Sequence, residues 1–351
     1  MRKEVDAVVL MNAVEPSMDS CFFYATGLVT GLFEGCVAIL EPRRTEVLTS
    51  ELEALSASEA GVKTTVFENG QESMRLMAKK LSRFSKIGIN ARELTVANHR
   101  KIRKASKGAK LIDVSQDLYR ARMIKQPDEL ARIRKACAIA SKTCVAIPEM
   151  VNEGMTETEV AAELNYRMMR LGANATAFDS NVAFGAKSAE PHYFPSPTRR
   201  LKKGQFALFD FGASYKRYVS DITRTFICHS STKRQREMHE TVLRAQEAAI
   251  DSIVDGVSGA TVDDAARKVI DSSEFRGLFI HSTGHGIGIS VHDPGSISSA
   301  NDMTLLEGMV LTVEPGVYIK GYGGVRIEDD VLVTKSGCRV LTSCPKELRS
   351  I

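Results

Sequence analysis

The sequence contains no tryptophan, no Cys-x-x-Cys pair, no long apolar run and no large excess of either charge. Seven cysteines without such a pair argue against a zinc knuckle and a thioredoxin-type site, and they favour reduced, buried thiols. The best apolar run, residues 36–40, is far shorter than the roughly 20 residues that a membrane helix needs. The net charge of +4, from 47 basic and 43 acidic residues, is too small and too evenly spread to favour nucleic-acid binding.

The same absences bear on the location of the protein. Residues 1–4 lead into only a brief apolar stretch, residues 7–11, so we expect no signal peptide. We therefore expect a cytoplasmic protein with neither a membrane nor a nucleic acid as partner. The 351 residues, of which 43% are hydrophobic and 26% charged, are typical of a globular chain of about two domains.

The first third of the chain alternates strand-like and helix-like segments. The spacing of apolar residues predicts helices over residues 71–84 and 96–105. Apolar or β-branched runs bounded by turn residues predict strands at residues 5–10, 35–40, 46–50, 64–67, 86–90 and 111–114. This alternation predicts a small α/β domain over residues 1–115.

The remainder, residues 116–351, has the pattern of a separate α+β domain. Helical spacing continues over residues 117–149, and capping signals predict helices over 156–171, 232–254 and 261–270. Apolar runs punctuated by glycine predict strands at residues 205–211, 219–228, 309–319 and 324–333. The pattern indicates antiparallel strands with separate helices.

Four of the seven histidines stand in two short neighbourhoods. His281, His285 and His292 fall within twelve positions of a glycine-rich stretch, and His192 follows Glu190-Pro191. A lone histidine is usually structural, but this grouping, where the backbone can approach a ligand, favours a site. The glycines do not match the G-x-G-x-x-G phosphate-binding pattern.

Four carboxylates stand inside or at the end of apolar strands: Asp210, Asp221, Glu314 and Glu328. A carboxylate there is costly to bury unless it is paired or binds a metal ion. If residues 214–218 turn a hairpin, the first two reach one face of the sheet. With one histidine the four have the composition of a metal-ligand set, whereas we interpret Asp329 and Asp330 as a polar turn or supporting residues.

The charge of this set favours two metal ions over one. About four negative charges match two divalent cations, and a single catalytic zinc ion usually takes only three protein ligands. Ligands rich in oxygen suit manganese, cobalt or iron as well as zinc.

At these residues the chain resembles the creatinase/prolidase/methionine aminopeptidase superfamily, the pita-bread metallopeptidases of family M24. The resemblance is strongest over residues 175–335 and is closest to the Xaa-Pro dipeptidase and aminopeptidase P branch. The segment from Phe23 to Gly27 resembles the family's Tyr-x-x-Gly segment, and Arg122, Lys125 and Glu129 resemble its entry into the catalytic domain. The resemblance implies a creatinase-like α/β domain over residues 1–115 and a pita-bread catalytic domain over residues 116–351.

The resemblance also implies a role for each site residue. Asp210 would chelate one metal ion, Asp221 and Glu328 would bridge two ions, and His285 and Glu314 would complete the second. His192, His292 and Arg326 would bind the substrate, and the catalytic residues are His192, His281, His292 and Glu314. Two ions, Mn²⁺ or Co²⁺ with Zn²⁺ or Fe²⁺ as alternatives, would supply a bridging hydroxide that attacks the peptide bond.

The expected function is thus hydrolysis of Xaa-Pro bonds in short proline-containing peptides by a homodimeric Xaa-Pro dipeptidase. The alternative is an aminopeptidase P that acts on longer peptides. A metal-free binding protein of the same fold and a creatinase are further alternatives, against which the complete ligand set argues. Two departures concern the substrate pocket: residues 186–190 differ from the family's usual residues, and Asp293 stands where glutamate is common. Without tryptophan, any wall that stacks on proline is built from phenylalanine, tyrosine or histidine.

Overall fold

The computed structural model describes residues 5–301 and 303–351 and divides into two compact units, Met1–Arg122 and Met123–Ile351. The signal-peptide prediction for residues 1–4 lies outside the described residues. The predicted domain boundary after residue 115 falls at the start of helix α5, Ser115–Met123. Within the described ranges, no helix has both the length and the apolar character to cross a membrane.

Unit 1 is built on a six-stranded mixed sheet in the order β4-β3-β2-β1-β5-β6. The strands are β1 Ala7–Met11, β2 Val37–Glu41, β3 Arg44–Ser50, β4 Lys63–Phe67, β5 Lys86–Ile89 and β6 Lys110–Asp113. The helices are α1 Ser20–Thr26, α2 Glu51–Glu59, α3 Gly70–Leu81 and α4 Val96–Ala105. The predicted α/β pattern is confirmed here, although the prediction missed α1 and α2.

Helices pack on both faces of this sheet, which explains why its central strand β1 is apolar throughout. Along β1, Ala7 and Val9 pack on one face with residues of α3 and α4. The alternate residues, Val8 and Leu10, pack on the other face with residues of α1 and α2. The period-two alternation of a strand therefore serves two cores at once.

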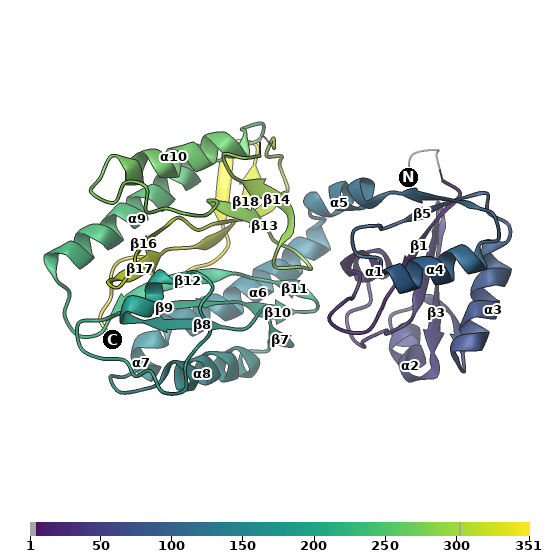
Figure 1. Ribbon diagram of the computed structural model, residues 1–351, viewed down its shortest axis with the longest axis horizontal. Coiled ribbons are helices and arrows are strands. Elements are labelled where there is room, and N and C mark those ends of the chain that lie inside the picture. Colours follow the sequence, from purple (N-terminus) through teal and green to yellow (C-terminus); the bar gives the residue numbers. More distant parts are fainter. Residues whose placement is uncertain (1–4, 302) are drawn as a thin grey trace. The chain divides into compact units, whose positions relative to one another are not determined.

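Unit 2 places helices outside a set of mainly antiparallel strands (Figure 1). Its helices are α6 Pro127–Val145, α7 Ile147–Met150, α8 Glu157–Arg170, α9 Lys233–Ser252 and α10 Gly259–Asp271, with a 3₁₀ turn η1 at Gly185–Ala189. Residues of α6 and α8 pack with β8, β9 and β12 in one core. Residues of α9 and α10 pack with β15 to β18 in another. The predicted α+β arrangement is confirmed.

The strands of unit 2 are short and often interrupted. They are β7 Ala175–Thr176, β8 Asn181–Phe184, β9 Phe206–Phe211, β10 Ala213–Tyr215, β11 Tyr218–Val219, β12 Ile222–Ile227, β13 Gly284–Gly286, β14 Asp293–Ile297, β15 Val310–Val313, β16 Gly316–Ile319, β17 Gly323–Arg326, β18 Asp329–Thr334 and β19 Gly337–Val340. The predicted hairpin forms between β10 and β11, with Lys216 and Arg217 at positive φ in its turn. Contrary to the turn interpretation, Asp329 and Asp330 begin β18.

Candidate metal centre and active-site pocket

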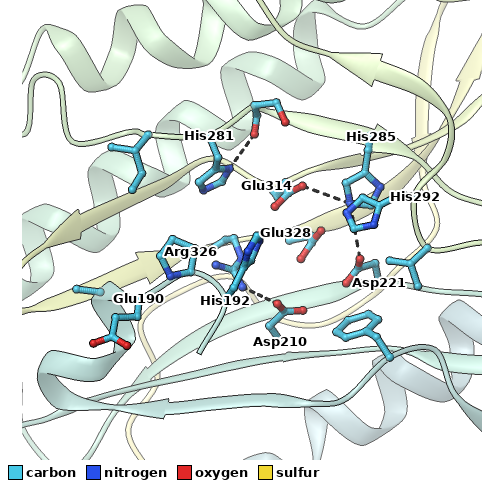
Figure 2. Close-up of a pocket in the computed structure, with 16 residues that line it drawn as sticks. Glu190, His192, Asp210, Asp221, His281, His285, His292, Glu314, Arg326 and Glu328 are labelled. Atoms are coloured by element: carbon cyan, nitrogen blue, oxygen red, sulfur yellow. Dashed lines mark hydrogen bonds and ion pairs between the residues drawn. The ribbon is translucent and has the colours of Figure 1, made fainter. Parts of the chain in front are cut away.

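One pocket of unit 2, with a volume of about 840 Å³, is lined by every site residue that the sequence predicted (Figure 2). These residues are His192, Asp210, Asp221, His281, His285, His292, Glu314, Arg326 and Glu328. They come from segments spread over more than a hundred positions of the chain, and the fold brings all of them to one cavity.

Three of the carboxylates lie where strands break. The prediction of continuous strands was wrong at these points: Asp221 lies between β11 and β12, Glu314 between β15 and β16, and Glu328 between β17 and β18. Asp210 stays within β9, where it is opposite Thr223 of β12. A side chain at a strand break is freed from strict in-and-out alternation, so each break turns a carboxylate toward the pocket.

His285 faces the carboxylates with its Nε2 atom. This atom lies 3.4 Å from Oε1 of Glu314 and 3.9 Å from Oδ2 of Asp221. The other ring nitrogen, Nδ1, lies 3.1 Å from the carbonyl oxygen of Gly286, which can only accept, so Nδ1 carries the hydrogen of the neutral ring. Burial lowers the pKa of His285. A neutral ring in this tautomer directs the Nε2 lone pair at the centre of the cluster, as a metal ligand requires.

The carboxylates of the cluster repel one another and are short of partners. Burial, followed by Glu328 and Asp210, raises the pKa of Asp221 well above its ordinary value. Burial, Glu314 and Asp210 do the same for Glu328. Among the described residues, Oδ1 of Asp210 and Oδ1 of Asp221 are buried without a hydrogen-bond partner.

These properties fit a divalent cation. The ligand atoms of Asp221, His285 and Glu328 all lie within 4.8 Å of one another. Bare carboxylates buried at this spacing are costly, and a multivalent cation offsets both the repulsion and the missing partners. The donor set of carboxylate oxygens and one imidazole suits such ions.

Arg326 connects the carboxylates to His281. Its Nη2 atom donates to Oδ2 of Asp210 at 2.6 Å, and its Nη1 donates to the hydroxyl of Tyr318 at 2.9 Å. That hydroxyl lies 2.8 Å from Nε2 of His281, whose Nδ1 lies 2.8 Å from the carbonyl oxygen of Ser282. Burial, followed by Arg326, lowers the pKa of His281 to about 4. His281 is thus a neutral ring with both nitrogens engaged.

The two acids that follow Glu328 support the cluster from behind. Oδ2 of Asp330 accepts the backbone N–H of Asp221 at 2.9 Å, which fixes the strand break at that residue. Asp329 instead pairs with Arg224 at 2.7 Å and Lys346 at 2.9 Å. Burial pushes the pKa of Asp329 up, but the two cations outweigh burial and hold the pKa below its ordinary value.

Further histidines and apolar side chains complete the lining of the pocket. The rings of His285 and His292 lie 4.3 Å apart, and His192 lines the same pocket (Figure 2). The sequence prediction missed Phe178, Ile280 and Val291, which also line the pocket. No motif marks these apolar residues.

Thr223 and Tyr318 also escaped prediction. Thr223 donates to Oε2 of Glu328 at 2.6 Å and accepts from Nε of Arg326. Thr223 is the cross-strand partner of Asp210, so the register of β9 with β12, which the sequence did not predict, would have been the signal. Tyr318, which bridges Arg326 and His281, had no comparable signal.

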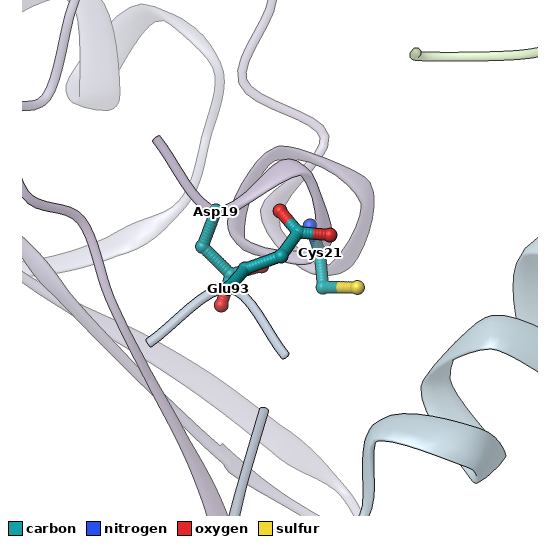
Figure 3. A group of neighbouring side chains, drawn as sticks. All are labelled: Asp19, Cys21 and Glu93. Atoms are coloured by element: carbon teal, nitrogen blue, oxygen red, sulfur yellow. The ribbon is translucent and has the colours of Figure 1, made fainter. Parts of the chain in front are cut away.

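A second group of ligand-type atoms within 4.8 Å of one another lies in unit 1 and consists of Asp19, Cys21 and Glu93 (Figure 3). Oδ1 of Asp19 caps α1 by accepting the backbone N–H of Cys21. Arg122 already supplies a positive charge there, 3.3 Å from Sγ of Cys21 and 3.6 Å from Glu93. Burial raises the pKa of Cys21 to about 12, which keeps the thiol protonated in the metal-free protein. This group stabilises the start of α1.

Comparison with known proteins extends these observations. Residues 131–335 match metallopeptidase family M24, and residues 1–124 match the creatinase/prolidase N-terminal domain. The chain is 44% identical to an Xaa-Pro dipeptidase of Pyrococcus furiosus over 239 residues, 68% of each protein. It is 35% identical to a putative dipeptidase, YkvY, of Bacillus subtilis over 334 residues, which cover 93% of this chain and 92% of that protein.

Solved structures resemble the whole chain. An X-Pro aminopeptidase from Thermotoga maritima superposes with a TM-score of 0.92 at 32% identity, covering 99% of this chain and 98% of that one. A prolidase from Pyrococcus horikoshii superposes with a TM-score of 0.89 at 34% identity, covering 98% and 95%.

Proposed function

The chain belongs to metallopeptidase family M24, and from this membership we propose that it is a metal-dependent exopeptidase that hydrolyses Xaa-Pro peptide bonds. A creatinase-like N-terminal domain precedes its pita-bread M24 domain. The observation that carries the proposal is the convergence of four carboxylates and one imidazole in a single pocket. The dipeptidases and aminopeptidases to which the chain is similar support the choice of proline-containing substrates.

Five residues would hold two divalent cations: Asp210, Asp221, His285, Glu314 and Glu328. When bound, such cations polarise the peptide carbonyl and lower the pKa of water, so that hydroxide is present near neutral pH. The unpartnered Oδ1 atoms of Asp210 and Asp221 support these assignments.

The other side chains would bind the substrate and move protons. His192 and His292 line the pocket and would donate hydrogen bonds to the carbonyl oxygen as it becomes negative. Glu314 would pass a proton from the attacking water to the leaving nitrogen. Arg326 would hold Asp210 directly through its hydrogen bond, and His281 would orient Arg326 through the Tyr318 hydroxyl that joins them.

Proline as the leaving residue suits this pocket. The nitrogen of an Xaa-Pro bond is tertiary and has no N–H for a peptidase to grip. Recognition must therefore come from packing on the pyrrolidine ring, for which Phe178, Ile280 and Val291 provide apolar surface.

Hydrolysis assays test the proposal directly. Met-Pro and Gly-Pro dipeptides, incubated with the protein and Mn²⁺ or Co²⁺, should be cleaved, and Asp221→Ala should abolish cleavage. The tripeptide Xaa-Pro-Xaa distinguishes a dipeptidase from an aminopeptidase P, which would prefer the longer substrate. If wild type cleaves no dipeptide with any metal, and any residual activity is the same in Asp221→Ala, the proposal is rejected in favour of a binding protein.

Three finer assignments belong to the same proposal. Mn²⁺ or Co²⁺ suits the oxygen-rich ligands, with Zn²⁺ and Fe²⁺ as alternatives, and elemental analysis of the purified protein identifies the ion. A homodimer in the cytoplasm is expected, which light scattering and cell fractionation test. Residues 1–115 are assigned to the N-terminal domain and residues 116–351 to the catalytic domain.

A further inference from the structure

A buried ion pair lies beside the pocket, outside the ligand set. Nζ of Lys125 lies 3.1 Å from Oδ2 of Asp293, and the two side chains are only 1% and 2% exposed. The two residues are 168 positions apart in the sequence. Burying such a pair is costly, so it is retained where it fixes one arrangement of the chain or serves another role.

Each partner is held at a place that matters for the site. Asp293 directly follows His292 and begins β14. Lys125 lies near the start of unit 2, and its backbone N–H donates to the carbonyl of Gly308, just before β15, the strand that leads to Glu314. The ion pair therefore joins the segment that bears His292 to the strand that carries Glu314 into the pocket.

The segment between His285 and Asp293 is shaped around this pair. A β-bulge follows His285, and Gly286 is paired with Asp293 across it. At Gly288 a Cβ atom would overlap Oδ2 of Asp293 and lie 3.2 Å from Cε of Lys125, so only glycine leaves room for the ion pair. The carbonyl of Gly288 in turn accepts the backbone N–H of Val219, two residues before Asp221.

We propose that Lys125 is a positioning residue, which holds His292 against His285 and toward the pocket through its buried ion pair with Asp293. The inference rests on the proposed function for the role of His292 at the substrate carbonyl. Lys125 is not among the described residues that line the pocket, so its ammonium group would act through the ion pair with Asp293. Without the ammonium group, Asp293 would be left buried beside Gly288 with one charge partner fewer, and the segment that carries His292 would shift to hydrate it.

The first test measures peptide hydrolysis by Lys125→Met, which keeps the length of the side chain and removes its charge. A contact made mainly in the transition state affects kcat more than KM, so kcat should fall roughly 10–100-fold while KM changes less than about threefold. In a His292→Ala background the same substitution should have little further effect, because Lys125 acts through His292. Full additivity of the two losses, or a kcat within twofold of wild type, would overturn the proposal.

The second test needs neither metal nor activity. In ¹⁵N-histidine NMR spectra of the metal-free protein, Lys125→Met should shift the imidazole signals of His285 and His292 and leave the remote, buried His239 unchanged. Unmoved His292 signals would overturn the proposal even if activity fell. If wild-type protein cleaves no Xaa-Pro substrate, the proposed function fails, and the spectra alone still decide the role of Lys125.

Matched variants guard against a trivial loss of structure. Lys80→Met removes a partly buried ion pair with Glu46 in unit 1, so it should lower the melting temperature without changing kcat or the His292 signal. If Lys125→Met does not fold, Asp293→Asn replaces it, since this change removes the charge of the ion pair from the other partner and keeps the size of the side chain. The same kinetic coupling and the same spectral shift are then expected, and their absence counts against the proposal.

Discussion

Two adjacent acids, Glu328 and Asp329, should respond to neutralisation with opposite signs in the metal-free protein. Both are fully or almost fully buried. Glu328 faces Asp221 and has Thr223 as a neutral donor, whereas Asp329 has two cations. Glu328→Gln and Asp329→Asn are therefore matched isosteric changes at neighbouring positions. The first should stabilise the metal-free fold and the second should destabilise it.

The structure sets the size of each effect. Ligand atoms of Glu328 and Asp221 lie within 4.8 Å, which corresponds to a repulsion of at least about 3.5 kcal/mol between two full charges at an effective dielectric constant of about 20. Because protonation already relieves part of this repulsion, we expect Glu328→Gln to raise the free energy of unfolding by about 1–3 kcal/mol. Asp329→Asn breaks buried ion pairs with Arg224 and Lys346 and should lower it by about 3 kcal/mol or more.

Thermal or urea unfolding of chelator-treated protein measures both changes. In thermal unfolding, each kcal/mol should shift the melting temperature by roughly 2–4 °C. With saturating Mn²⁺, wild type should become more stable than Glu328→Gln, because metal binding stabilises the wild-type fold and the variant lacks one of the ligands. If Glu328→Gln destabilises the metal-free protein as Asp329→Asn does, Glu328 has a structural cation partner, and the reasoning from repulsion is wrong.

Three further predictions concern pH, backbone space and metal. Burial and Arg224 lower the pKa of His239 in α9 from 6.5 to about 4, so the native state binds fewer protons than the unfolded state between these values. The contribution of neutral His239 to the free energy of unfolding is fully present above pH 6.5, and wild type should lose up to about 3 kcal/mol of that free energy as the pH falls toward 4. Urea unfolding at a series of pH values measures the loss, and an equally steep dependence on pH in a His239→Gln variant would contradict this. Gly288→Ala should lower both the melting temperature and kcat because its Cβ overlaps Asp293, while Gly70→Ala, which has open space, should be nearly neutral in both measurements. Treatment with EDTA should abolish Xaa-Pro hydrolysis and lower the melting temperature, and added Mn²⁺ or Co²⁺ should restore both; retained activity after verified metal removal would speak against a metal enzyme.

Much of the fold was predictable because local signals agreed with the tertiary structure. Helix α4 was predicted to the residue, and the capping box at Thr156 correctly opened α8. Helices α1 and α2 were missed. Helix α1 is short and mostly apolar, and Ala57 is the only residue of α2 that is buried. Neither has the amphipathic period that identifies a helix in sequence.

The site shows where sequence reasoning stops. The apolar contexts of Asp210 and Glu314 indicated buried carboxylates, and both are half-buried where they line the pocket. The breaks at Asp221 and Glu328 were not predicted, because the flanking residues have continuous strand propensity, whereas Pro315-Gly316 directly after Glu314 was a turn signal that the prediction did not use. The partners that distinguish Asp329 from Glu328 are Arg224 and Lys346, and such long-range contacts leave no local pattern.

The most direct test of the central claim counts metal ions and locates them. Metal-free protein titrated with Mn²⁺ should bind two ions per chain, and anomalous diffraction from the loaded crystal should place both among Asp210, Asp221, His285, Glu314 and Glu328. Asp221→Ala should lose at least one of the two. A single ion, an ion elsewhere, or unchanged binding by Asp221→Ala would contradict the account.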